Sequence, residues 1–413
     1  MKKRRNLYLN RYAYPLSISD GFTPRSATEM VVVVPSYNES FTADAVQSLL
    51  DCDPPSGHVV ILVVVNQPAN ATDEVKETNS RAIGILREMA SPPSISLEVC
   101  HLELPPKKAG VGLARKAGMD EAVRWFENLG KDGLIVCYDA DCTCTPNYLT
   151  AIEDYYLDKT RKAGVVFYEH PLDHREIIQY ELFLRYYIDA LRYVGFPYAF
   201  QTLGSCITVR SSRYQQVGGM SPRKAGEDFY FLHKAIPLGG FGEINDVTVM
   251  PSSRVSDRVP FGTGHAIAKM RTEEAYGVYD PKSLEVLGNV FANRERWYKE
   301  PWGRLHPMVD EFHRENGFEE GMRKAIANSK DLLGFERRFF EWWDAFRVLK
   351  FMHFCRDQYL PEVPLSEGLL WLNDRLWHLP TDDQVVSVRQ LQRIRDWDRA
   401  YRAENGKHPS QRL

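Results

Sequence analysis

The sequence lacks the long hydrophobic runs, the strong net charge and the paired cysteine motifs that mark several classes of protein. No apolar stretch approaches the roughly 18 residues that a bilayer-spanning helix needs. The net charge of the 413-residue chain is only −3, which gives no reason to expect nucleic-acid binding. The sequence has 7 cysteines, and the C-x-C at Cys142 and Cys144 has no second pair to complete a zinc site. We therefore expect a globular cytoplasmic protein in which the thiols are reduced, small buried groups.

The beginning of the chain, MKKRRNLYLNRY, is its most basic stretch. No apolar core and no small-residue cleavage site follow it, so we do not expect a signal peptide. We interpret residues 1–27 as a basic N-terminal arm in solvent. The alternative is a weak, peripheral contact with anionic lipid at the inner face of the membrane.

The first half of the sequence alternates apolar strands with helical patterns. The apolar runs at 31–34 and 59–65 predict central strands of a parallel sheet. Helical patterns follow these strands, and one of them is expected to end near Gly130. Strands separated by helices imply βαβ units. We predict an α/β protein with a mostly parallel central sheet, plus a helical C-terminal region that begins at about residue 285.

The C-terminal region contains an aromatic stripe within residues 336–354. Phe339, Trp343 and Phe346 recur there at helical spacing, and Leu349 and either His353 or Phe354 continue the pattern. A stripe of this kind is typical of a core helix, and we expect it to pack the C-terminal region onto the sheet domain. An acceptor groove and an interfacial membrane helix are the alternatives.

Polar residues follow several predicted strands at their carboxyl ends, where open parallel sheets bind ligands. Asp139 and Asp141 come directly after a buried strand. Carboxylates at such a position are costly unless a cation or hydrogen bonds stabilise them. Oxygen ligands suit Mg²⁺ or Mn²⁺, which combine one or two carboxylates with substrate phosphates. The other polar or aromatic residues expected at this edge are Pro35, Ser36, Tyr37, Asn38, Glu39 and Asn66.

Five stretches occur in a recognisable order: VVVVPSYNES, KKAGVGLARKAGMDEAV, LIVCYDADCTCTPNYL, GSCITVRSSRYQQVGGM and AGEDFYFLHKA. Together they resemble family 2 glycosyltransferases with the A-type fold. The resemblance covers roughly residues 28–265. It implies a nucleotide-diphospho-sugar transferase fold, which is Rossmann-like, for a catalytic domain at 28–284. Residues 285–413 would then be a helical extension packed on that domain.

The resemblance also implies roles for individual residues on the donor side. Asp139 would lie near the ribose and the metal, and Asp141 would bind the metal beneath the diphosphate. His265 would be a further metal ligand, unless it is a hydrogen-bonded structural histidine. Arg115 would contact the base or a phosphate, although a surface helix charge is the alternative. The remaining residues that would bind the nucleotide-sugar are Pro35, Tyr37, Asn38, Glu39, Lys108, Gly110, Gly219 and Arg258.

On the acceptor side, the resemblance makes Asp228 the general base of an inverting transfer. Glu227 would contact the acceptor or orient the loop. Both acids stand at the start of a predicted helix, whose dipole would hold Asp228 ionised. One departure concerns the nucleotide, because relatives commonly carry an aspartate where this chain has Asn66. An amide can both donate and accept, so a UDP-sugar is favoured while GDP or another nucleotide stays open.

We therefore expect a metal-dependent, non-processive enzyme that uses Mn²⁺ or Mg²⁺. It would move one sugar from a nucleotide-sugar to a hydroxyl group of a saccharide or glycoconjugate. A sugar nucleotidyltransferase is one alternative, but PSYNES lacks the basic, glycine-rich phosphate loop that such an enzyme needs. A degenerate transferase that binds a ligand or a membrane is the other. Asn66 favours that alternative slightly, while Asp139, Asp141 and Asp228 disfavour it.

Overall fold

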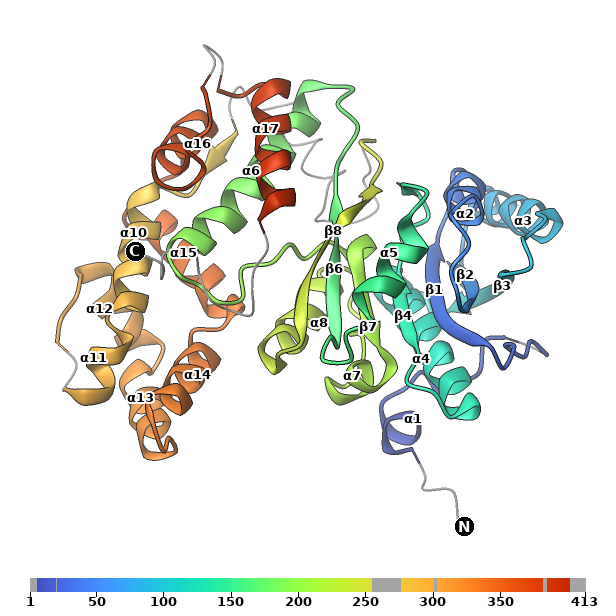
Figure 1. The fold of residues 1–413 in the computed structure, drawn as a ribbon, viewed down its shortest axis with the longest axis horizontal. Helices are drawn as coiled ribbons and strands as arrows, with labels where there is room; N and C mark the ends of the chain where they lie inside the picture. Colours follow the sequence, from blue (N-terminus) through green and yellow to red (C-terminus); the bar gives the residue numbers. More distant parts are fainter. Residues whose placement is uncertain (1–5, 20, 255–275, 301–302, 382–384, 402–413) are drawn as a thin grey trace. The chain divides into compact units, whose positions relative to one another are not determined.

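The computed structural model describes residues 6–19, 21–254, 276–300, 303–381 and 385–401. The chain folds as two compact units, each made of two segments (Figure 1). The first unit consists of Met1–Pro171 and Thr202–His265, and the second of Leu172–Gln201 and Ala266–Leu413. The second unit thus includes a segment that the sequence analysis assigned to the catalytic domain. The expected packing of residues 285–413 on that domain stays a prediction.

The first unit is built on an eight-stranded sheet with the order β3-β2-β1-β4-β7-β6-β8-β5. Strands β3, β2, β1 and β4 are parallel, and β7 runs antiparallel to both of its neighbours. The predicted α/β class and mostly parallel sheet are confirmed. The valine-rich strands β1 and β2 are buried along almost their whole length, as expected of central parallel strands covered on both faces. The strands are β1 Thr28–Ser36, β2 His58–Pro68, β3 Ile95–Leu104, β4 Leu134–Cys137, β5 Thr143–Cys144, β6 Ala163–Tyr168, β7 Ile207–Arg210 and β8 Phe241–Met250.

Helix α4 is the long helix that packs against the central strands β1 and β2. It ends at Gly130, as predicted, because this residue takes a left-handed conformation with φ 68°. A Cβ atom at Gly118 would lie 2.5 Å from Cγ1 of Val33, so the helix can approach the sheet closely only with glycine there. The helices of this unit are α1 Leu7–Arg11, α2 Thr42–Leu50, α3 Asp73–Glu88, α4 Val111–Leu129, α5 Tyr148–Tyr155, α7 Ser211–Gln216 and α8 Glu227–Ala235.

The N-terminal segment 6–19 lies against α4 and is not the solvated arm that the sequence suggested. The hydroxyl of Tyr8 donates to Oδ1 of Asp120 at 2.6 Å, and the amide of Tyr14 donates to Oδ2 at 2.6 Å. Asp120 is fully buried. Gly219 has a φ of 72°, and a Cβ atom on it would lie 1.9 Å from the Tyr8 hydroxyl oxygen. Glycine is therefore required at 219 for the packing of this segment.

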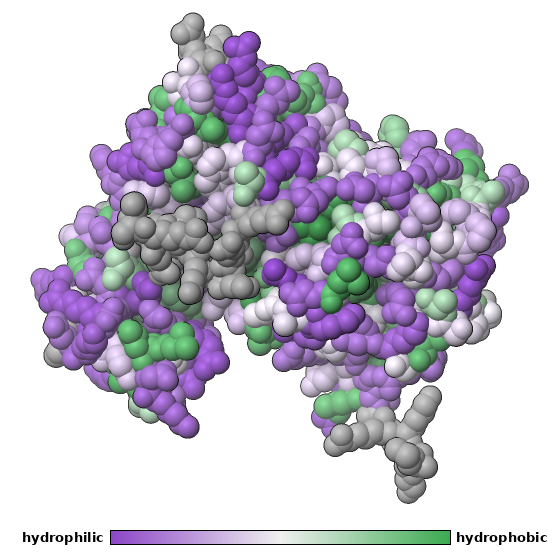
Figure 2. Space-filling view, viewed as in Figure 1, coloured by the Kyte–Doolittle hydropathy of each residue, from purple (hydrophilic) through white to green (hydrophobic). Residues whose placement is uncertain are grey.

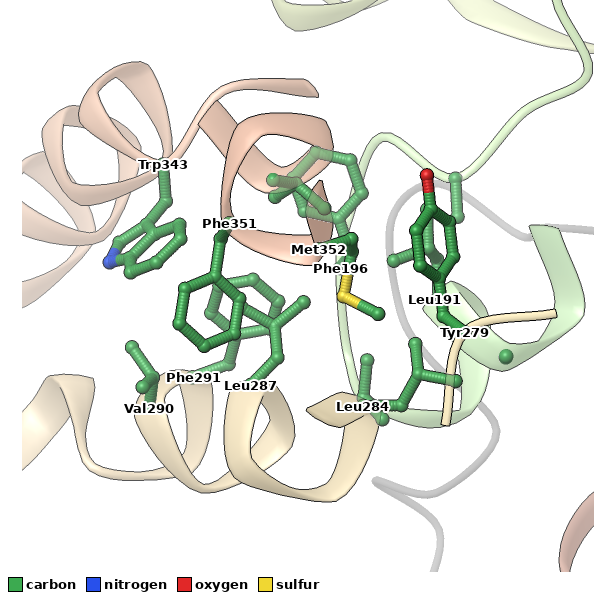
Figure 3. Close-up of a cluster of buried hydrophobic side chains, with 14 of the residues drawn as sticks. Leu191, Phe196, Tyr279, Leu284, Leu287, Val290, Phe291, Trp343, Phe351 and Met352 are labelled. Atoms are coloured by element: carbon green, nitrogen blue, oxygen red, sulfur yellow. The ribbon is translucent and has the colours of Figure 1, made fainter. Parts of the chain in front are cut away.

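The described part of the second unit is helical, apart from a two-stranded antiparallel pair, β9 and β10. Its core is a large cluster of buried aromatic and aliphatic side chains, which includes Phe291, Trp343 and Phe351 (Figure 3). The predicted helical C-terminal region is confirmed. The elements are α6 Arg175–Tyr193, β9 Gly277–Val278, α10 Pro281–Ala292, α11 Arg294–Lys299, α12 Pro307–Glu315, α13 Phe318–Ala327, α14 Leu332–Trp342, α15 Ala345–Gln358, β10 Val363–Pro364, α16 Leu365–Leu372 and α17 Val388–Ala400.

The predicted aromatic helix over 336–354 is two helices, α14 and α15, that break at Trp343. The carboxylate of Asp344 accepts a hydrogen bond from the amide of Arg347 at 2.8 Å and so caps the start of α15. Phe339 and Trp343 are fully buried, as the stripe predicted, but Phe346 is 46% exposed. The break changes the helical phase, which turns Phe346 away from the core.

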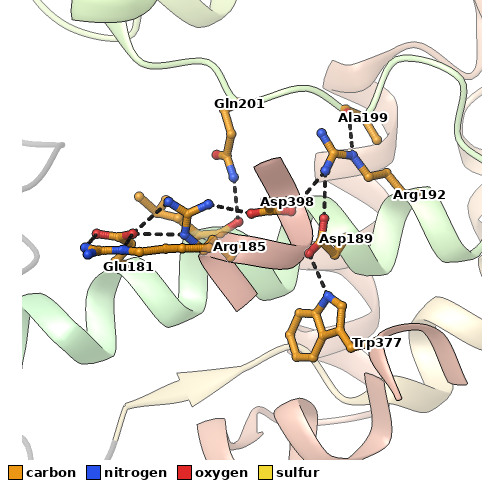
Figure 4. Close-up of polar contacts among 10 residues, drawn as sticks. Glu181, Arg185, Asp189, Arg192, Ala199, Gln201, Trp377 and Asp398 are labelled. Atoms are coloured by element: carbon orange, nitrogen blue, oxygen red, sulfur yellow. Dashed lines mark hydrogen bonds and ion pairs between the residues drawn. The ribbon is translucent and has the colours of Figure 1, made fainter. Parts of the chain in front are cut away.

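Helix α17 is joined to α6 by a buried network of charged side chains (Figure 4). Arg185 donates to Asp398, and Arg192 donates to both Asp398 and Asp189. The indole nitrogen of Trp377 donates to Asp189 at 2.8 Å. Asp398 and Asp189 thus each accept a hydrogen bond from a buried donor. These hydrogen bonds offset the free-energy cost of removing the two carboxylates from water.

Among the described residues, no helix is long and apolar enough to cross a membrane. On the face drawn in Figure 2, hydrophobic residues lie as scattered patches among hydrophilic ones. The packed N-terminal segment exposes Leu7, Tyr12 and Leu16. A peripheral membrane contact through this segment stays a prediction.

Candidate active site

The carboxyl ends of β1 and β4 lie side by side, because Val33 pairs with Cys137 in parallel register. Tyr37, Asn38 and Glu39 follow one strand, and Asp139 and Asp141 follow the other. The side chains of the two aspartates are 35% and 30% exposed, respectively. The sequence prediction that these residues gather at one edge of the sheet therefore agrees with the structure, and the two carboxylates can be reached from solvent.

Arg115, near the start of α4, joins two acids that lie far apart in the sequence. Its guanidinium group donates to Asp139 at the end of β4 and to Glu227 at the start of α8. Its side chain is only 3% exposed, so the alternative of a surface helix charge is wrong. Burial alone would lower the pKa of Arg115, but the carboxylates of Asp139 and Glu227 outweigh burial and raise it. The group is therefore a fixed positive charge.

Gly204 leaves room for this arginine. A Cβ atom at Gly204 would lie 2.8 Å from Nη1 and 2.9 Å from Nη2 of Arg115. Because Arg115 is held by two carboxylates, its head cannot move aside easily. Gly204, the first residue of the motif GSCITVR, thus contributes to the site because it has no side chain that would collide with Arg115.

Asp228 follows Glu227 in the first turn of α8, and its side chain is partly buried. Burial and, to a smaller extent, the neighbouring Glu227 carboxylate raise the pKa of its carboxyl to about 7, although Arg115 and the Phe229 amide act to lower it. We expected the helix dipole to hold Asp228 ionised, but desolvation acts against the favourable interactions at the helix start and raises its pKa. A carboxyl that titrates near neutral pH is well suited to accept and release a proton.

A second arginine, Arg254, joins two further acids of the site. Its Nη1 donates to Oε1 of Glu39 at 2.7 Å, and its Nη2 lies 3.3 Å from Oδ2 of Asp141. Glu39 is buried, while Arg254 is 26% exposed. Its pairing with Glu39 and Asp141 was not foreseen, since no local pattern relates position 254 to position 39.

The side chain of Asn66 is buried and makes a hydrogen bond within the fold, near the ends of β1 and β2. Its side-chain nitrogen donates to the carbonyl oxygen of Ser36 at 2.8 Å. Asn79 on α3 completes the arrangement, because it donates to the carbonyl of Asn66 at 3.1 Å and accepts from the amide of Asn38 at 3.0 Å. Asn38 has a φ of 47°, a conformation that asparagine tolerates better than most residues. The side-chain amide of Asn66 donates the hydrogen bond to Ser36, and an aspartate at this position could not donate it.

The other predicted site residues lie in different surroundings. Pro35 is buried in β1, Tyr37 is partly buried, and Lys108 is exposed just before α4. Gly110 lies against Lys224, because a Cβ atom on it would be 3.3 Å from Cγ of that residue. Gly219 packs against Tyr8. Arg258 and His265 lie outside the described residues.

The residues present fit a small divalent cation only in part. Within the described ranges, no group of three or more His, Cys, Asp or Glu side chains is arranged to hold a metal ion. Asp139 and Asp141 offer two partly exposed carboxylates, each of which contacts an arginine. Mg²⁺ commonly takes one or two carboxylates and completes its shell with water and substrate phosphates. Two carboxylates alone would thus leave the rest of the shell of a cation to water or to a diphosphate.

Comparison with known proteins gives distant structural likenesses only. No protein-family model and no curated protein matches the sequence. Among solved structures, S. aureus TarS 1-349 in complex with UDP-GlcNAc is 13% identical at a TM-score of 0.39, over 90% of this chain and 91% of that one. The complex of the same protein with UDP is 14% identical at a TM-score of 0.39, over 86% and 94%. The chain is also similar to the mannosyltransferase PcManGT from Pyrobaculum calidifontis, in complex with GDP-Man and Mn²⁺, at 16% identity and a TM-score of 0.37, over 95% and 92% of the two chains.

Proposed function

We propose that this protein is a glycosyltransferase that moves one sugar from a nucleotide-sugar to a hydroxyl group of a saccharide or glycoconjugate. The observation that carries the proposal is the contact of Arg115 with both Asp139 and Glu227. These three residues belong to three of the five stretches that resemble family 2 glycosyltransferases. Their contact joins the expected donor side of the site to the expected acceptor side.

Asp228 is the general base in this proposal. The acceptor hydroxyl loses its proton to the Asp228 carboxylate as its oxygen attacks the anomeric carbon of the donor sugar. Because attack comes from the face opposite the leaving diphosphate, the anomeric configuration inverts. The pKa of about 7 for Asp228 supports this role, since a base is most effective when its pKa is near the working pH.

Asp139 and Asp141 would hold Mn²⁺ or Mg²⁺ in this proposal. A bound divalent cation would supply positive charge to the leaving diphosphate. Arg254 contacts Asp141 at 3.3 Å, so Asp141 becomes fully available to a cation only when this guanidinium turns away. The diphosphate is the anion that Arg254 would meet instead.

A UDP-sugar is the favoured donor, and the nucleotide is the least constrained part of the proposal. Asn66 takes the place of an aspartate that relatives commonly carry, and its side-chain nitrogen already donates to Ser36. Its remaining oxygen can accept a hydrogen bond from a base edge. This capacity suits uracil and guanine alike.

A donor screen tests the proposal directly. The full-length protein is incubated with Mn²⁺ and each of several UDP- and GDP-sugars, and release of the nucleoside diphosphate is measured. We expect hydrolysis of one donor, lost in both Asp141→Asn and Asp228→Asn. Release of pyrophosphate from a nucleoside triphosphate and a sugar phosphate would instead establish a nucleotidyltransferase. Failure to bind or hydrolyse any donor would leave the degenerate, ligand-binding alternative.

A further inference from the structure

Two cysteine thiols, from Cys52 and Cys144, face each other near the candidate site. Their sulfur atoms are 3.8 Å apart, although 92 residues separate them in the sequence. Cys52 comes just after helix α2, and Cys144 ends strand β5. Both are free thiols in the structure.

The surroundings of the pair favour reaction at Cys144. Cys144 is partly exposed, while the other six cysteines are buried. The Cys52 sulfur lies 3.3 Å from the carbonyl oxygen of Ser48, and the Ser48 hydroxyl lies 3.8 Å from the Cys144 sulfur. A hydrogen bond from Cys52, with further ones from Tyr138 and Ser48, lowers the pKa of the Cys144 thiol against the opposing effect of burial. A thiolate that can be reached from solvent is the form that oxidants attack.

We propose that Cys52 and Cys144 form an oxidation site at which a peroxide converts the two thiols into a disulfide. The Cys144 thiolate attacks one peroxide oxygen, the O–O bond breaks, and Cys144 becomes a sulfenic acid while hydroxide leaves. The Cys52 sulfur then attacks the Cys144 sulfur, the S–O bond breaks, and the oxygen leaves as water with the Cys52 proton. The two thiols are oxidised by two electrons in total, and the peroxide is reduced by the same two.

Formation of the disulfide requires only a small movement of the two sulfur atoms. A disulfide requires an S–S distance of about 2.05 Å, so the sulfur atoms must approach from their separation of 3.8 Å. Cys144 lies at the end of a two-residue edge strand whose partner is β8, and such short pairings shift readily. The disulfide would tie the end of α2 to β5. It would thereby link the segment that follows Glu39 to the segment that follows Asp141. This site does not depend on the proposed function.

Other cysteines of the first unit provide the comparison. Cys142 is one residue from the pair's strand, but its sulfur lies toward Oδ1 of Asp141 at 4.0 Å and it is buried. Cys137 is buried against Met119, with 3.6 Å between the sulfur atoms. Cys100 is buried in β3. Cys100→Ser is therefore a matched control that removes a buried thiol away from the pair.

The test uses the full-length protein, treated with hydrogen peroxide and then alkylated with N-ethylmaleimide in denaturant. We expect two of the 7 thiols to escape alkylation, a cross-linked peptide that contains Cys52 and Cys144, and full recovery with dithiothreitol. Cys100→Ser should still form the same cross-link, whereas Cys52→Ser and Cys144→Ser should not. Alkylation of every thiol, over-oxidation of Cys144 to a sulfinic acid, or a cross-link to Cys142 would each overturn the proposal. The peptide map of the natural sequence decides the matter even where a serine variant fails to fold.

Discussion

Arg115 and Glu227 form a buried ion pair across 112 residues of sequence. This pair fixes the first turn of α8 to α4, so that Asp228, the next residue, stands at the edge of the site. Arg115 also acts on Asp228 through space, because its charge opposes the rise that burial imposes on the pKa of the Asp228 carboxyl. The resulting value of about 7 therefore depends on the geometry of a contact in which Asp228 takes no direct part.

The first prediction is that Asp228→Asn slows sugar transfer by about 10²- to 10⁴-fold, the usual contribution of a general base. Asparagine keeps the size of the side chain but cannot accept the proton. Donor affinity should change little, since Asp228 is expected on the acceptor side. Steady-state kinetics with the true acceptor measure the effect, and Asp44→Asn on the exposed face of α2 is the control. Near-normal turnover in Asp228→Asn would end the assignment.

The second prediction concerns the pH dependence of the same step. The carboxyl of Asp228 has a pKa of about 7, and only its ionised form accepts a proton. The rate should therefore fall as pH decreases below about 7, by roughly tenfold for each pH unit, and should level off above it. The residual activity of Asp228→Asn should lack this acidic limb. A profile that stays flat from pH 5 to pH 8 in the natural sequence would contradict the role of this carboxyl.

The third prediction is that Asp141→Asn abolishes the metal-dependent part of nucleoside diphosphate binding while the fold is retained. An amide oxygen is a weaker ligand for a hard cation than a carboxylate. Calorimetric titration of UDP and GDP, with and without Mn²⁺, measures the effect. Asp154→Asn on the exposed side of α5 should behave like the natural sequence. Equal affinity with and without Mn²⁺ in the natural sequence would show that the metal assignment is wrong.

Much of the fold could be predicted because local patterns determine it. The valine runs in β1 and β2 are apolar at successive positions, as is typical of a strand that is buried on both faces. Gly130 ends α4 through a left-handed conformation that favours glycine. Arg115, Asp139 and Glu227 could be assigned to one site because each lies in a stretch that resembles a known family.

What could not be predicted depends on contacts between distant parts of the chain. The pairing of Arg254 with Glu39 joins residues 215 positions apart. The sequence around either residue does not indicate that it pairs with the other. The break between α14 and α15 was missed because Asp344, within a strong helical pattern, was not recognised as an N-cap. The raised pKa of Asp228 follows from desolvation, which depends on the packing around α8 rather than on its sequence.

The fourth prediction is that Asn66→Asp destabilises the protein. The Asn66 amide donates to the carbonyl of Ser36 at 2.8 Å in a buried setting. A carboxylate cannot donate, and it would face that carbonyl oxygen unpaired, at a cost of about 1–3 kcal/mol. Urea unfolding measures the loss, and Asn70→Asp, at an exposed position, is the control. Unchanged stability in Asn66→Asp would mean that the Ser36 contact is dispensable.

The fifth prediction concerns the buried charges between α6 and α17. Asp398 accepts from both Arg185 and Arg192, so Asp398→Ala leaves two buried guanidinium groups with one partner fewer. Removing one partner of a buried ion pair typically costs about 3–5 kcal/mol. We expect α17 to detach first, with faster hydrogen exchange in its amides and earlier proteolysis there. Asp396→Ala, on the exposed side of the same helix, should leave both measurements unchanged. If Asp398→Ala unfolds at the same denaturant concentration as the natural sequence, the network does not hold α17 in place.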